Sequence, residues 1–390
     1  MASFARPATS AVRASIEADK QHGAVVPPLY LSSNYAFAGF GEKRRYDYTR
    51  SGNPTRDALG DALADLEGGA GAVITSSGMA ALTLLCQLLK PGDLLLAPHD
   101  CYGGTHRLFQ SLAAKGHFEL EFVDQTDEAA LRRALRRKPA LILVETPSNP
   151  LLRIVDIEAI VGAAGACGAL VAVDNTFLSP ALQQPLALGA DIVIHSTTKY
   201  LNGHSDVVGG ALVASTGELA EVLDWWANCL GITGAPFDSY LTLRGVRTLF
   251  ARMKQHQRNA QLLASVLDEH ELVRRVYYPG LPQHPGHDIA RRQQRGFGGM
   301  VSFELTGGEP AVRAFLESLE HFSLAESLGG VESLVCHPAS MTHAPVGEEA
   351  LKAAGIGQNL IRLSLGIEDA EDLVNDVITA LERSRAVRAA

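Results

Sequence analysis

Residues 170–200 read LVAVDNTFLSPALQQPLALGADIVIHSTTKY. Two apolar runs, Leu170–Asp174 and Asp191–His195, each end on residues able to do chemistry. Short apolar runs bounded by turn residues are typical of buried strands in a parallel sheet. In such sheets, ligands bind beyond the carboxyl ends of the strands. The stretch therefore predicts a site formed by Asp174 and by the Ser196-Thr197-Thr198-Lys199 segment that follows the second run.

Strands and helices alternate on both sides of this stretch. We expect further strands at Ala72–Thr75, Leu94–Ala97, Glu119–Val123 and Ala140–Glu145. Helix-period segments such as Ala80–Leu89 and Leu131–Lys138 lie between them. This alternation predicts an α/β fold whose mostly parallel sheet is covered by helices on both faces.

The C-terminal part has a different order of elements. A long helix is expected at Leu249–His270, and the period-2 and helical patterns that follow it alternate. The expected elements are strand Val301–Leu305, helix Val312–Leu319, strand Ile361–Leu365 and helix Leu373–Leu381. We therefore predict an extended N-terminal arm at 1–60, a large α/β domain at 61–255 and a smaller α+β domain at 256–390.

Composition excludes several classes of protein. The 390 residues are 46% hydrophobic and 20% charged, with a formal net charge of −9. This balance is that of an ordinary globular chain and a poor match to a nucleic-acid-binding protein. The five cysteines are widely spaced with no C-x-x-C pair, so neither a disulfide framework nor a metal site is expected. With no apolar run of the roughly 18–20 residues of a membrane span and no signal-like segment, we expect a cytoplasmic enzyme.

Three features separated in sequence match the needs of one cofactor. Ser76-Ser77-Gly78-Met79 opens a helix after a strand, and such a helix start can bind a phosphate, although a simple helix cap is the alternative. Asp174 can pair with a cationic ring nitrogen, and Lys199 can react with an aldehyde. Together they predict a site for pyridoxal 5′-phosphate. A nicotinamide-dependent oxidoreductase would also fit the alternation, but the chain has no glycine fingerprint after a strand.

Several motifs make the sequence similar to a known family. They are Tyr46-Asp47-Tyr48-Thr49-Arg50-Ser51-Gly52-Asn53-Pro54, Ser77-Gly78-Met79-Ala80, Tyr102-Gly103-Gly104-Thr105, Glu145-Thr146-Pro147-Ser148-Asn149-Pro150, His195-Ser196-Thr197-Thr198-Lys199-Tyr200 and Ala325-Glu326-Ser327-Leu328-Gly329-Gly330. From about Val25 to Leu381 the chain resembles the Cys/Met-metabolism enzymes of the type I pyridoxal-phosphate fold, which is the fold of aspartate aminotransferase. Trp225-Trp226-Ala227-Asn228 favours the synthase branch of that family.

The resemblance implies a role for each matching residue. Lys199 would carry the cofactor and then move protons, Tyr102 would stack on its ring, and Glu326 would take part in catalysis. The remaining cofactor contacts would come from Tyr48, Arg50, Gly78, Met79, Asn149, Asp174, Ser196 and Thr198. Substrate contacts would come from Arg107, Asn149, Glu326, Ser327 and Arg362. Of these, Tyr48 and Arg50 would reach the phosphate of a neighbouring subunit.

The resemblance also implies a reaction and an assembly. The expected activity is γ-replacement on an O-acylated homoserine by L-cysteine, giving L-cystathionine in trans-sulfuration and methionine biosynthesis. Family members that act at Cγ carry an acid at the position of Glu326, whereas β-lyases tend to have an aromatic residue near it. Cystathionine γ-lyase and O-acylhomoserine sulfhydrylase activities stay open as alternatives. A homotetramer built from dimers is expected.

The acyl group of the donor is not decided by the resemblance. Synthases that use the succinyl ester often carry a second arginine directly after the arm arginine, and this chain has Ser51 there. Arg107 would then have to bind the distal carboxylate of a succinyl donor. Succinyl-, acetyl- and phosphohomoserine therefore remain candidates, with the succinyl ester as the first choice.

Overall fold

A computed structural model describes residues 6–343, 347, 351–352 and 354–388 of the chain. Its larger sheet has seven strands in the order β1-β7-β6-β5-β4-β2-β3, and only β7 runs antiparallel to its neighbours. The strands are β1 (Gly71–Thr75), β2 (Leu94–Pro98), β3 (Glu119–Val123), β4 (Leu141–Glu145), β5 (Leu170–Asp174), β6 (Ile192–Ser196) and β7 (Gly210–Ala214). The prediction of a mostly parallel α/β sheet is confirmed.

Both faces of this sheet are buried. Leu141 and Leu143 of β4 pack into one apolar core, and Ile142 and Val144 pack into the other. This two-sided burial explains why the central strands are continuously apolar. The helices of this part of the chain are α2 (Pro54–Glu67), α3 (Gly78–Leu85), α4 (Gly103–Ala114), α5 (Glu128–Leu135), α6 (Ile157–Gly165), α7 (Ser179–Leu182), α8 (Gly217–Leu230) and α9 (Pro236–Val246), with short 3₁₀ turns at Cys86–Leu88 and Pro185–Leu188.

Two predicted helices differ from the observed ones at their ends. Helix α3 begins at Gly78 because Ser77 caps it, the side-chain oxygen accepting the N–H of Ala80. The last turn of the helix predicted at Ala80–Leu89 is instead a 3₁₀ turn, Cys86–Leu88. Helix α5 begins at Glu128 because Asp127 accepts the N–H groups of the first turn, so the helix lies three residues earlier than the apolar pattern indicates.

Strand β7 was missed by sequence reasoning, and it matters for the site. Its first residue, Gly210, pairs with Thr75 at the end of β1 and with Ser196 at the end of β6. A Cβ on Gly210 would lie 2.2 Å from the backbone oxygen of Ser77. The absence of a side chain therefore allows the start of α3 to sit directly on this edge of the sheet.

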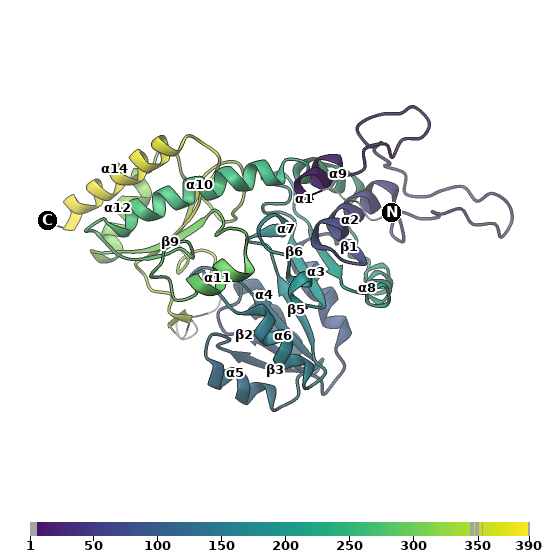
Figure 1. Ribbon diagram of the computed structural model, residues 1–390, viewed down its shortest axis with the longest axis horizontal. Coiled ribbons are helices and arrows are strands. Elements are labelled where there is room, and N and C mark those ends of the chain that lie inside the picture. Colours follow the sequence, from purple (N-terminus) through teal and green to yellow (C-terminus); the bar gives the residue numbers. More distant parts are fainter. Residues whose placement is uncertain (1–5, 344–346, 348–350, 353, 389–390) are drawn as a thin grey trace.

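The C-terminal part of the chain forms a second sheet of five strands in the order β10-β11-β12-β9-β8. Helix α10 (Leu249–Asp268) runs from the body of the larger sheet to this smaller one and crosses the predicted boundary at residue 255 (Figure 1). The other elements are β8 (Val273–Tyr277), α11 (His287–Gln293), β9 (Met300–Leu305), α12 (Gly308–Ser318), β10 (Ser323–Leu324), β11 (Leu334–Cys336), β12 (Leu360–Ser364) and α14 (Ala370–Arg388).

The N-terminal segment extends away from the body as open loops (Figure 1). Within residues 6–60, only helix α1 (Pro7–Arg13) and the first turns of α2 are helical, so the extended part is shorter than the predicted arm. Apolar side chains of this segment are exposed, among them Val25, Leu31, Phe37 and Phe40. Throughout the described chain, no helix has the length and apolar character to cross a bilayer.

Candidate active site

A cavity of about 390 Å³ lies beyond the carboxyl ends of β4, β5 and β6. It is lined by residues from both halves of the chain. The predicted site residues that line it are Gly78, Met79, Tyr102, Asn149, Asp174, Ser196, Thr198, Lys199, Glu326, Ser327 and Arg362. The cavity thus lies at the edge of the sheet that the strand-end rule indicates.

Lys199 lies at the centre of this group. Its Nζ donates a hydrogen bond to Ser327 Oγ at 2.7 Å. The pKa of the Lys199 amine is lowered to about 8, chiefly by burial and also by the positive charge of Arg362, while the negative charge of Glu326 opposes both effects. A much larger share of this amine is therefore neutral near neutral pH than for an ordinary lysine, as a nucleophilic or basic amine requires.

Arg362 is held in a fixed orientation beside the lysine. Its side chain is almost wholly buried, although the sequence pattern placed it on the polar face of its strand. Nη1 donates to Asn149 Oδ1 at 2.8 Å, and Nη2 donates to the backbone oxygen of Ser327 at 2.8 Å. Buried Nε has no hydrogen-bond partner among the described residues. A buried guanidinium with a donor to spare suits a carboxylate ligand.

The start of α3 forms one end of the cavity. Gly78 and Met79 belong to the first turn, whose N–H groups have no acceptor within the helix. A Cβ on Gly78 would lie 2.9 Å from Ser196 Cβ, so glycine is needed for α3 and β6 to approach this closely. Helix N–H groups next to the hydroxyl-bearing residues Ser196 and Thr198 form an environment suited to a phosphate.

Two carboxylates, buried Glu145 and partly buried Asp174, lie side by side at the ends of β4 and β5. Glu145 and Asp174 are register partners in the sheet, and both line the cavity. Burial raises the pKa of each carboxyl, and the charge of Asp174 raises that of Glu145 further, whereas hydrogen bonds from Thr176 oppose the shift of Asp174. A cation bound here would compensate the cost of burying their charge.

Three predicted site residues lie outside this cavity. Arg107 is on the exposed side of α4. Tyr48 is exposed, and the guanidinium of Arg50 lies 5.7 Å from the centre of its ring. Arg50 Nη1 also bonds to the backbone and side-chain oxygens of Asn228, both at 2.8 Å, so it has a partner within its own chain.

The family model described as Cys/Met metabolism PLP-dependent enzyme matches residues 8–382. The chain belongs to this family. It is 60% identical to the cystathionine gamma-synthase of Escherichia coli K12 over 373 residues, which are 95% of this chain and 97% of that protein. It is 48% identical to the cystathionine beta-lyase of Lactococcus lactis subsp. cremoris MG1363, covering 96% and 98% of the two chains.

Solved structures of the Cys/Met-metabolism family agree with this assignment. Two structures of cystathionine gamma-synthase from Xanthomonas oryzae pv. oryzae match with a TM-score of 0.98 and 62% identity, covering 99% of this chain and 100% of theirs. One is a complex with aminoacrylate and cysteine, and the other is a complex with cystathionine. The type I fold and the pyridoxal-phosphate dependence expected from sequence are thereby confirmed.

The cavity fits the cofactor of the family. The start of α3 at Gly78 suits the phosphate, Asp174 suits a protonated ring nitrogen, and Lys199 presents an amine of lowered pKa. Each of the three parts of the cofactor thus has a complementary group in one cavity. When bound, pyridoxal 5′-phosphate supplies an aldehyde for covalent attachment and a ring that stores an electron pair.

Sequence reasoning missed several residues that line the cavity. They are Leu82, Glu145, Pro147, Thr176, Phe177, Ile194, Val208, Leu328 and Thr342. Glu145 could have been found, because it ends a strand on a carboxylate as Asp174 does. Thr176 accepts the N–H of Ser196 at 2.9 Å and so links the segments that follow β5 and β6. No local pattern indicates Val208 or Thr342.

Proposed function

We propose that this protein catalyses γ-replacement, in which the thiol of L-cysteine displaces the acyloxy group of an O-acylated homoserine. A Cγ–O bond breaks, a Cγ–S bond forms, and the products are L-cystathionine and the carboxylate of the leaving group. The proposal agrees with the relatives, since the matched Xanthomonas enzyme binds cysteine and cystathionine. The observation that carries it is the meeting of Lys199, Arg362 and Glu326 in one cavity.

Arg362 binds the α-carboxylate of the amino-acid substrate in this proposal. Its Nη atoms are already engaged by Asn149 and Ser327, which hold the guanidinium plane still. The free Nε–H offers a donor without moving the side chain. Arg362 and Lys199 both donate hydrogen bonds to Ser327, so their side chains lie close together. A substrate whose carboxylate is bound by Arg362 would therefore have its Cα near Lys199.

Lys199 moves the protons. As a neutral amine it takes the proton from substrate Cα. It must then deliver that proton to the conjugated system that the bound cofactor would supply, and the neutral amine so restored takes a proton from Cβ, which the expulsion of a γ-leaving group requires. Ser327 Oγ accepts a hydrogen bond from Nζ at 2.7 Å and so gives the amine a defined starting position. With the cofactor bound, Tyr102 would pack against its ring, and Asp174 would keep the ring nitrogen protonated.

Glu326 directs the chemistry to Cγ. Its negative charge stabilises the protonated form of Lys199 across the cavity. It can therefore hold the ammonium between the two carbons, or orient the amino group of the incoming cysteine. A β-eliminating enzyme needs only the first deprotonation, so it has less use for an acid at this position.

Steady-state assays with the three donors test the proposal. Purified holoenzyme is incubated with succinyl-, acetyl- or phosphohomoserine plus cysteine, and cystathionine is quantified by mass spectrometry. We expect cystathionine with at least one donor, and the succinyl ester first. No cystathionine from any donor would refute the proposal.

The same assay separates the alternatives within the family. Cystathionine as sole substrate yields 2-oxobutanoate and ammonia if the enzyme is a γ-lyase, and pyruvate if it is a β-lyase. Sulfide in place of cysteine yields homocysteine if it is a sulfhydrylase. An Arg107→Leu variant should raise KM for the succinyl ester more than for the acetyl ester if Arg107 binds the distal carboxylate.

The N-terminal arm supports an assembly of several copies. Its exposed apolar side chains lie on loops that extend from the body (Figure 1), as expected of a segment covered by another subunit. We propose a homotetramer of dimers in which Tyr48 and Arg50 complete the phosphate site of a neighbour. Light scattering tests the assembly, and a fully active monomer would contradict it. The cytoplasmic location stays a prediction.

A further inference from the structure

We propose that Glu145 is a positioning residue. Its carboxylate binds the backbone of the two loops on which Tyr102 and Asn149 lie and so fixes where these two residues line the cavity. The inference rests on the proposed placement of the cofactor between Tyr102 and the strand ends. It adds that Glu145 accepts hydrogen bonds from the backbone of Tyr102 and Asn149 and thereby determines the positions of their side chains.

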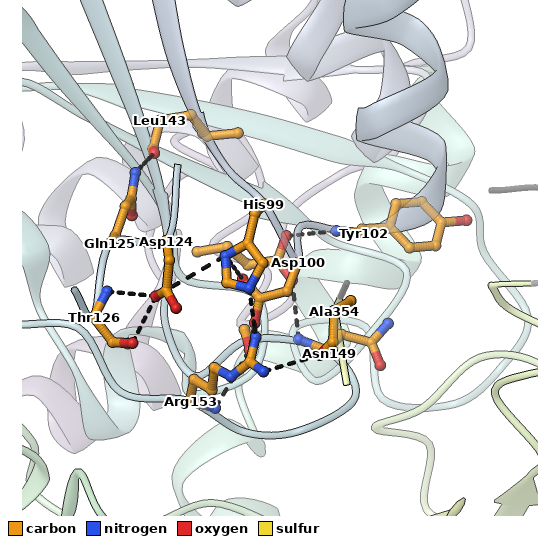
Figure 2. Close-up of polar contacts among 12 residues, drawn as sticks. His99, Asp100, Tyr102, Asp124, Gln125, Thr126, Leu143, Asn149, Arg153 and Ala354 are labelled. Atoms are coloured by element: carbon orange, nitrogen blue, oxygen red, sulfur yellow. Dashed lines mark hydrogen bonds and ion pairs between the residues drawn. The ribbon is translucent and has the colours of Figure 1, made fainter. Parts of the chain in front are cut away.

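The carboxylate of Glu145 bridges two loops. Oε2 accepts the backbone N–H of Tyr102 at 3.0 Å, and Oε1 accepts the backbone N–H of Asn149 at 3.1 Å. The two donors lie 43 residues before and four residues after Glu145 in the chain. In Figure 2 the side chains of Tyr102 and Asn149 point to the same side. One buried carboxylate therefore sets the spacing of the ring-facing tyrosine and the asparagine that holds Arg362.

The position of the tyrosine ring depends on this anchor. A Cβ on Gly104 would lie 2.5 Å from Tyr102 Cε1 and 2.9 Å from Met79 Sδ. The ring thus lies directly over the glycine of the first turn of α4, with no side chain between them. Since Tyr102 begins this helix without a side-chain cap, its backbone bond to Glu145 is what ties the helix start to β4.

A second set of polar contacts holds the same two loops further from the cavity. Asp100 Oδ2 accepts hydrogen bonds from Ser148 Oγ at 2.7 Å and from Arg153 Nη1 at 3.0 Å. Arg153 also contacts His99 and donates from Nη2 to the backbone oxygen of Ala354 at 2.9 Å (Figure 2). These contacts join the loops as a whole, so replacing Glu145 should shift the residues nearest the cavity and leave the loops joined.

The chemistry of a carboxylate suits this position. Both oxygens are acceptors, and each receives one backbone N–H, whereas glutamine offers one acceptor and turns a donor toward the other N–H. Burial and the charge of Asp174 raise the pKa of Glu145, and the two backbone N–H donors oppose this rise because they stabilise the ionised form. The need for two acceptors, together with the cavity lining, distinguishes Glu145 from a residue that only fills the core.

Asp376 offers a matched control. Its carboxylate, also buried, accepts two backbone N–H groups, from Glu320 at 2.9 Å and from His321 at 2.8 Å. It lies on α14 and does not line the cavity. Asp376→Asn removes the same kind of double acceptor as Glu145→Gln, so both variants should lower the melting temperature by comparable amounts.

The test compares cofactor affinity and ring orientation in the two variants. Apoenzyme is titrated with pyridoxal 5′-phosphate, and visible circular dichroism reports the asymmetry of the bound chromophore. We expect Glu145→Gln to weaken cofactor binding at least about tenfold, to change the dichroic band, and to lower kcat by about a hundredfold, as a misplacement of about 1 Å can do. Asp376→Asn should change each of these less than about twofold, as expected for distant sites.

Two results would overturn the inference. One is a Glu145→Gln enzyme whose cofactor affinity and dichroic band match those of Asp376→Asn. If Glu145→Gln does not fold, Glu145→Asp provides the second test. This variant keeps both acceptor oxygens but shortens the side chain by one methylene, so it should show the same changes to a smaller degree. A Glu145→Asp enzyme with wild-type affinity and dichroism refutes the positioning role. Wild-type protein that binds no cofactor through Lys199 would instead refute the proposed function.

Discussion

The reactivity of Lys199 should follow its burial. A pKa of about 8 lies about 2.5 units below the ordinary value of 10.5. At pH 7 about one-tenth of the amine is then neutral, against roughly one part in 3000 for an ordinary lysine, a gain of about 300-fold. Because Glu326 raises this pKa, Glu326→Gln should move the midpoint below that of wild type.

Competitive labelling of apoenzyme measures this midpoint. Trace acetic anhydride is added at a series of pH values with N-acetyl-lysine amide as internal standard, and acetylation of the Lys199 peptide is quantified by mass spectrometry. We expect a midpoint near 8 in wild type and a lower one in Glu326→Gln. A wild-type midpoint equal to that of the standard would show that burial does not control the amine.

The same shift has a consequence for stability. The folded state binds fewer protons than the unfolded state between pH 8 and pH 10.5, so apoenzyme stability should rise with pH in that window. Below pH 8, the protonated Lys199 lowers the free energy of unfolding of the apoenzyme by about 3 kcal/mol. Lys199→Met should therefore be more stable than wild type at pH 7 and lose that advantage by pH 10.5. Urea unfolding at the two pH values measures the difference, and an equal difference at both would contradict the assignment.

Further variants test the other proposed roles. Lys199→Ala should lower turnover at least about a thousandfold, because Lys199 is the one lysine among the described residues that line the cavity; a smaller loss in steady-state assays would mean that another group acts as the base. Arg50→Ala should weaken cofactor retention by roughly 1.5–3 kcal/mol, the value of a charge-assisted hydrogen bond, measured by dialysis and absorbance; unchanged retention would remove the arm from the phosphate site. Glu326→Ala should lower kcat/KM for γ-replacement far more than it lowers cofactor affinity. An unchanged kcat/KM would show that Glu326 has only a structural role, as a cap.

Local patterns were sufficient for the strand-end residues. Asp174 and Lys199 follow buried apolar runs, and parallel strands bring their carboxyl ends to one edge whatever the details of packing. The same argument covers Gly78 and Met79 after β1. Glu145 also follows this rule, because strand β4 ends on it.

Other features needed the tertiary structure. Strand β7 opens on a glycine, a poor strand former, and its antiparallel place between β1 and β6 is decided by packing. Arg362 alternates with apolar residues, which predicts a solvent-facing side chain, but contacts with Asn149 and Ser327 bury it. These partners lie 213 and 35 residues away in the chain, so no local periodicity signals them.

By itself, the sequence determined the α/β class, the family and the residue types that the cofactor requires, because these depend on short-range patterns and on motifs of contiguous residues. The tertiary structure alone decided how the groups at the strand ends ionise and that residues of the smaller sheet join them. The pKa of Lys199 depends on burial and on charges carried by Glu326 and Arg362, and a chain brings such groups together only when both sheets have formed. Electrostatic effects of this kind act through space over a few ångströms, whereas sequence records only distance along the chain.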